Sequence, residues 1–165
     1  MALSMYQASA PVFLRALRVL HALLEKGEAS GVPAADLVEA RLAPDMMGLA
    51  GQIQRASDSA KGAVARLAGA AAPSMPDEET TLAQLKERVA QTIAFIETVP
   101  EAGFEGAESR EIKFKAGPYD LEFTGASYLL TFAIPNFFFH VTTAYALLRM
   151  KGVQIGKLDY LNPPT

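Results

Sequence analysis

The chain has 165 residues, with 15 basic and 18 acidic side chains and a formal charge of −3. Half of the residues are apolar and a fifth are charged, which excludes a disordered chain and leaves ample material for a core. The absence of cysteine excludes disulfides, thiolate metal sites and a cysteine nucleophile, and the mild negative charge argues against a nucleic-acid partner. We expect a single domain over residues 1–165.

The first residues carry no basic segment ahead of an apolar run, so no signal peptide is expected. Apolar residues then recur every three or four positions in four long segments, which predicts helices over residues 11–26, 45–68, 82–99 and 127–150. A short helix is expected over residues 33–41. Pro11 suits a first helical turn, Asp45 is a candidate cap, and Gly27 and Gly69 suit helix ends.

The third long helix has the clearest signals. Thr81 followed by Gln84 resembles a capping box, and residues 70–76 before it have the composition of a linker. Lys86, Glu87 and Arg88 lie off its apolar stripe.

A β-hairpin is predicted between the third and fourth long helices. A two-residue turn at Gly117-Pro118 sets apolar residues opposite apolar residues and lysines opposite acids. The predicted pairs are Ile112–Phe123, Lys113–Glu122, Phe114–Leu121, Lys115–Asp120 and Ala116–Tyr119.

The last long helix belongs to a stretch from Phe123 to Leu148 without a formally charged residue. Its length would span a bilayer, yet it contains several polar residues and no Lys/Arg cluster flanks one end. We therefore expect a helix buried on most sides in a cytoplasmic protein with no membrane contact. Pro135 predicts a kink in this helix or a late start of its first turn. Residues 153–165 are predicted to be irregular chain on the surface. The predicted fold class is mainly all-α: a four-helix bundle with a short β-hairpin. Up-down-up-down is the simplest topology, and the alternative is that the two intervening segments cross an end of the bundle.

Common catalytic signatures are missing, including phosphate-binding and dinucleotide-binding glycine loops, zinc-protease helices and nucleophile elbows. The sequence assigns no catalytic residue.

His21 stands four residues before Glu25, a spacing that fits an ordinary helix ion pair or half of a metal site. Asp58 and Lys61 are expected to form a surface pair.

His140 has the strongest claim to a functional role. Asn136 lies one turn before it on the same helix face, and such a polar pair is costly in an apolar segment unless it is hydrogen-bonded or lines a wet cavity. The two interpretations are an inter-helix pocket and a satisfied core network. Gln52 would face the same cavity if its helix is a neighbour, and Asp45 would share its helix face.

Five strings resemble an uncharacterised bacterial family, domain of unknown function nineteen-ninety-three, within the DinB/YfiT-like four-helix-bundle superfamily. These strings are Arg41–Met46, Gln52–Lys61, Ala65–Gly69, Thr92–Phe95 and Pro135–Tyr145. The resemblance implies a DinB-like bundle and a homodimer. Some relatives carry a divalent metal on three histidines or transfer thiol cofactors to small electrophiles.

Matched position by position, the places of those three histidines fall on Gln52, with Gln54 as the alternative, and on Asn136 and His140. Two amides would replace two imidazoles, and amide oxygens are weak ligands for transition metals. We therefore expect no divalent metal and assign Gln52, Asn136 and His140 to ligand binding. The leading hypothesis is a small-molecule binding protein. The alternatives are a thiol-transferase-like or metal-dependent enzyme with a degenerate triad, and a non-catalytic structural or dimerisation module.

Overall fold

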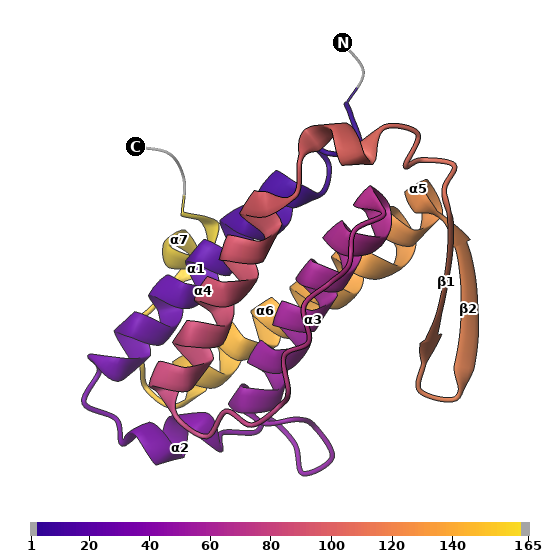
Figure 1. The fold of residues 1–165 in the computed structure, drawn as a ribbon. Coiled ribbons are helices and arrows are strands. Elements are labelled where there is room, and N and C mark those ends of the chain that lie inside the picture. Colours follow the sequence, from indigo (N-terminus) through magenta and orange to yellow (C-terminus); the bar gives the residue numbers. More distant parts are fainter. Residues whose placement is uncertain (1–2, 163–165) are drawn as a thin grey trace.

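The computed structural model describes residues 3–162 and is mostly helical (Figure 1). The four long helices are α1 (Ala10–Glu28), α3 (Leu49–Ala68), α4 (Leu82–Thr98) and α6 (Ile134–Met150). The shorter helical elements are α2 (Ala34–Val38), the 3₁₀ turn η1 (Glu101–Phe104), α5 (Gly125–Tyr128), the π turn η2 (Leu129–Ala133) and α7 (Lys157–Leu161). A hairpin of β1 (Glu111–Ala116) and β2 (Tyr119–Thr124) completes the chain.

The long helices form a four-helix bundle, as predicted. Both α1 and α3 pack against α4 and α6, so α1 and α3 occupy a diagonal of the bundle. The core between them consists of side chains without solvent contact, among them Phe13, Leu20, Ile53, Leu85 and Phe137. The capping box of Thr81 and Gln84 is present at the start of α4.

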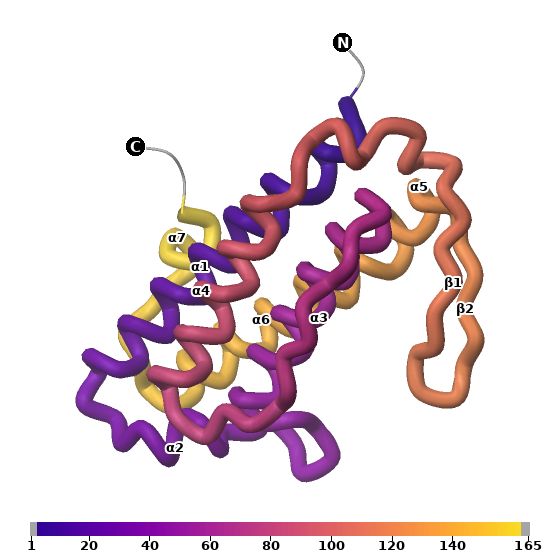
Figure 2. Tube along the Cα trace, viewed as in Figure 1, coloured from indigo at the N-terminus to yellow at the C-terminus, as the bar shows by residue number. Residues whose placement is uncertain are grey.

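The direction of the helices differs from the simple up-down-up-down guess, which is wrong. Helix α3 runs parallel to α4, since the irregular segment of residues 70–81, named the strap here, returns along the whole of α3 (Figures 1 and 2). A 20-residue helix is about 30 Å long, and twelve extended residues reach about 40 Å. The strap is therefore long enough for α4 to begin again at the same end of the bundle as α3.

The hairpin has the predicted register at every pair, from Ile112 opposite Phe123 to Ala116 opposite Tyr119. Its apolar face is buried where the strands leave the bundle and exposed at the tip. Ile112 is 3% exposed and Tyr119 is 68% exposed. In Figure 1 the hairpin stands beside α3 and α6, so it forms a side wall next to their contact.

The last predicted helix is one helical run from Gly125 to Met150 with a π turn near its start. The turn ends at Ala133, two residues before Pro135, which has no N–H to donate to the preceding turn. The expectation of burial on most sides is wrong: Phe137 is fully buried, but Phe139 is 54% exposed. A corner helix of the bundle has neighbours only on the sides of α1 and α3. Within residues 3–162, no helix combines the length and hydropathy required to cross a membrane.

Two further boundaries correct the sequence prediction. Asp45 does not cap the second long helix, because α3 begins at Leu49 after Gly48 and the preceding residues form turns. The tail is not irregular surface chain throughout: Val153 and Ile155 are buried, and α7 packs against α1. Residues 163–165 of the predicted tail lie outside the described residues.

Candidate functional site

Three polar pairs connect α3 to the run from α5 to α6. Gln52 contacts His140 at 2.8 Å, Ser59 contacts Asn136 at 2.7 Å, and Arg66 contacts Tyr128 at 3.2 Å. We call these six residues the polar seam. On α3 they recur every seven residues, which places them on one face of the helix. The sequence-predicted residues Gln52, Asn136 and His140 all belong to this seam.

The hydrogen bonds around Gln52 determine which nitrogen of His140 carries a proton. The Gln52 amide nitrogen donates to the Met47 carbonyl at 3.1 Å, so its oxygen faces the imidazole. An amide oxygen only accepts, and His140 Nδ1 must therefore donate to it. In the neutral ring the proton is then on Nδ1, and Nε2 carries a free lone pair.

His140 Nε2 is not fully buried. Among residues 3–162 it has no hydrogen-bond partner, and the only buried side-chain nitrogen or oxygen without one is Nε of Arg88. Burial lowers the pKa of His140 below its usual 6.5, and the positive charge of Arg55 lowers it further. The site thus presents a neutral imidazole with one anchored nitrogen and one accepting nitrogen.

Asn136 lines a cavity of about 280 Å³ between the hairpin and the polar seam, which we call the hairpin cavity. Its Nδ2 donates to Ser59 Oγ, which leaves the amide oxygen free to accept. The cavity wall consists of Arg55, Asp58, Ser59, Arg66, Phe114, Lys115, Tyr128, Phe132, Ala133 and Asn136. Gln52 and His140 are not part of this lining, so they lie beyond the Asn136 end of the cavity.

The polar seam does not fit a divalent transition metal. The oxygen of Gln52 is directed at His140 Nδ1, on the opposite side of the ring from the free Nε2. That leaves one imidazole and one neutral amide as donors, a poor set for such ions. In the described part of the chain, no three His, Cys, Asp or Glu side chains gather closely enough to hold an ion.

The other pairs singled out in the sequence lie elsewhere. His21 Nδ1 is 3.8 Å from Glu25 Oε2 on a half-exposed face of α1, in keeping with a helix ion pair. Lys61 does contact Asp58 at 2.8 Å, but Lys61 is 8% exposed and the pair is not on the surface. It belongs to a larger ionic network.

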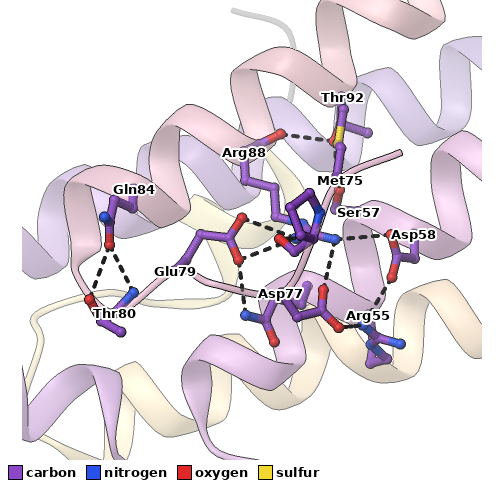
Figure 3. A network of polar contacts seen from close by, with 12 residues as sticks. Arg55, Ser57, Asp58, Met75, Asp77, Glu79, Thr80, Gln84, Arg88 and Thr92 are labelled. Carbon is purple, nitrogen blue, oxygen red and sulfur yellow. Dashed lines mark hydrogen bonds and ion pairs between the residues drawn. The ribbon is translucent and has the colours of Figure 1, made fainter. Parts of the chain in front are cut away.

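Sequence reasoning missed that network, which surrounds Arg88 (Figure 3). The Arg88 guanidinium is 1% exposed and contacts three carboxylates: Glu79 at 3.0 Å, Asp58 at 3.0 Å and Asp77 at 3.1 Å. It also donates to the Pro76 carbonyl. Glu79 and Asp77 belong to the strap, so Arg88 fastens the strap to α3 and α4.

Balanced charge makes this burial tolerable. Arg88, Arg55 and Lys61 provide three cations for the three carboxylates. Burial alone would raise the pKa of Glu79, but hydrogen bonds from Gln54 and Arg88 outweigh burial and lower it. The available signal in the sequence was the acidic strap itself, with Asp77, Glu78 and Glu79 in succession.

Comparison with known proteins agrees with this architecture. A family model described as a domain of unknown function (DUF1993) matches residues 5–161. The chain is also similar to a crystal structure of a DinB family member protein from Shewanella denitrificans, at 38% identity and a TM-score of 0.89. That similarity covers 97% of this chain and 93% of the other, and the fold is therefore DinB-like. No curated protein matches the chain.

Proposed function

The chain belongs to the DUF1993 family of DinB-like bundles, and from that premise we propose that it is a small-molecule binding protein. The ligand would contact the polar seam, with His140 and Asn136 as direct partners and Gln52 as the residue that orients the imidazole. We further propose that it acts in the cytoplasm.

One observation carries this proposal: among residues 3–162, His140 combines an anchored Nδ1 with an unpartnered Nε2 that is not fully buried. Polar atoms of a buried side chain that only stabilises a core normally have hydrogen-bond partners. Here the hydrogen-bond chain from Met47 through Gln52 fixes the tautomer and leaves the accepting nitrogen available. A donor group of a ligand, such as a hydroxyl or an amide, would complete the arrangement.

A thermal-shift screen of metabolites tests the proposal, with His140→Ala and His21→Ala as a matched pair. These are the only two histidines, and His21 lies on α1 away from the seam. A ligand at one hundred times its Kd stabilises by about 2.7 kcal/mol, which raises Tm by roughly 5–10 °C in a chain of this size. We expect the shift in the parent protein and in His21→Ala, and its loss in His140→Ala.

The stability of the unliganded variants gives a second criterion. His140→Ala removes the hydrogen bond to Gln52 and leaves the amide oxygen of this buried residue unpaired, so we expect a cost of about 1–3 kcal/mol. A loss of several kcal/mol, with no compound that distinguishes the two variants, would assign His140 to core structure and refute the binding proposal.

A second candidate, thiol-transfer chemistry, is favoured by the same free Nε2. A neutral imidazole could accept the proton of a bound thiol, and the resulting thiolate sulfur would then displace a leaving group from an electrophile. Incubation with glutathione and a chlorodinitrobenzene tests this candidate, because chloride release above the rate of His140→Ala is required.

The homodimer stays a prediction, which size-exclusion chromatography with light scattering would test.

A further inference from the structure

We infer that the hairpin cavity binds an organic anion with a flat apolar body and that Arg66 holds its anionic group. The inference goes beyond the proposed function, because Gln52 and His140 do not line this cavity. Its support comes from a different end of the seam, where Arg66 and Tyr128 face the hairpin.

The guanidinium of Arg66 is held in place without a carboxylate partner. It lies over the Phe114 ring at 4.4 Å from the centroid, and its Nη1 donates to the Tyr128 hydroxyl at 3.2 Å. Within residues 3–162 it makes no ion pair, and its other N–H groups have no acceptor. A planar guanidinium fixed on a ring presents forked donors at its edge, which suits a carboxylate or phosphate.

The charge around the cavity has the matching sign. Three cations line it, namely Arg55, Arg66 and Lys115, and Asp58 is its only acid. Arg55 and Asp58 already balance each other within the ionic network, and Lys115 lies 3.8 Å from Asp120. Of these lining cations, Arg66 is therefore the one whose charge no acid of the described chain offsets, and it provides a positive potential for an incoming anion.

The remaining wall indicates the body of the ligand. Phe114 packs edge to face against Tyr128 and Phe132, which stack on each other, and the ring centroids lie 5.3–6.0 Å apart. About 280 Å³ equals the space of roughly nine water molecules, which fits a single small ring with one substituent. The free oxygen of Asn136 at the opposite end would accept from a donor on that ring.

Gly62 makes this position of Arg66 sterically possible. A Cβ at residue 62 would lie 2.6 Å from Arg66 Nη1, so any other residue must push the guanidinium away. Glycine inside a helix costs about 1 kcal/mol relative to alanine. A structural role alone would favour alanine at this position, whereas a site that needs Arg66 over Phe114 favours glycine.

The experiment measures binding of benzoate and of its neutral isostere benzamide by isothermal titration calorimetry on the full chain. The variants are Arg66→Gln, Gly62→Ala and, as a matched control, Arg18→Gln. Arg18 is an exposed arginine of α1 that pairs with Glu97, far from the cavity. Circular dichroism and thermal unfolding accompany each variant.

We expect benzoate to bind in preference to benzamide. Loss of the charge-assisted hydrogen bonds in Arg66→Gln should weaken benzoate by about tenfold to a hundredfold, with Arg18→Gln unchanged. Gly62→Ala should also weaken benzoate while its Tm stays equal or rises, which separates binding from folding. Equal binding of benzoate and benzamide, no benzoate binding at millimolar concentration, or full binding by Gly62→Ala and Arg66→Gln would overturn the inference.

The same titrations on His140→Ala separate this inference from the proposed function. If Arg66-dependent benzoate binding persists but no compound ever depends on His140, the anion site stands and the His140 proposal fails. If the affinity for a ligand requires His140 but depends neither on the charge of that ligand nor on Arg66, the proposed function stands and the anion site fails.

Discussion

Replacing Arg88 by Met should destabilise the protein more than replacing any other charged residue of α4. The side chain donates to Glu79 and to the Pro76 carbonyl through Nη1, and it contacts Asp58 and Asp77 through Nη2. Met matches the length of its aliphatic part but leaves these partners without their shared cation. Removing one member of a buried ionic network typically costs about 3–5 kcal/mol.

The structure explains why the cost stays within that range. Asp58 keeps Lys61 and Arg55 as partners, Asp77 keeps Arg55, and Glu79 keeps a hydrogen bond from Gln54. The net change is one uncompensated negative charge under the strap. For a chain of this length each kcal/mol lowers Tm by roughly 2–4 °C, which gives a shift of about 6–20 °C.

Urea unfolding followed by circular dichroism measures the effect directly, and Arg18→Met is the control. Arg18 pairs with Glu97 where both side chains are half exposed, so its loss should cost under about 1 kcal/mol. The double variant Arg88→Met/Glu79→Gln restores charge balance and should recover part of the loss. Equal free energies of unfolding for Arg88→Met and Arg18→Met would refute the role assigned to the network.

Three further outcomes follow from the same contacts. The pKa of His140, measured by NMR beside the resonance of His21, should lie below 6.5. As the pH falls below about 6.5, this histidine therefore binds a proton in the unfolded chain before it does so in the folded chain. Its contribution to the free energy of unfolding then decreases until the pH reaches the pKa of the folded state. Arg55→Gln should raise that pKa, and an unchanged value would remove Arg55 as a cause. Gly125→Ala should cost at least about 1–3 kcal/mol in urea unfolding, because its Cβ would lie 1.8 Å from the Ala107 carbonyl oxygen; an unaffected midpoint would contradict that clash.

The hairpin shows when a sequence determines geometry by itself. A shift of one residue would place each lysine opposite an apolar residue, so only one register satisfies both faces, and that register is present. The capping box of Thr81 and Gln84 is equally local. Helix direction is different, because periodicity is the same in either direction. Only the reach of the strap shows that α4 can run parallel to α3.

The burial of Arg88 could not be predicted from the sequence for a related reason. Helical periodicity correctly placed it off the apolar stripe of α4, but the strap covers that face and brings acids from outside the helix. For the candidate site, spacing alone pairs Asn136 with His140, whereas Gln52 joins them only if its helix is a neighbour, and the family resemblance supports that placement. The contact of Arg66 with Tyr128 was not foreseen, since the π turn lengthens the interval from Tyr128 to Asn136 to eight residues.

Arg55 connects the ionic network to the polar seam. It pairs with Asp58 and with Asp77 of the strap, and its charge also lowers the pKa of His140. It lines the hairpin cavity on one side and a second cavity beside the strap on the other. A change in how the strap docks would reposition the Asp77 carboxylate and alter the potential that Arg55 exerts on the imidazole. The protonation of His140 thus depends on a segment that never touches it, because both are coupled to the same guanidinium.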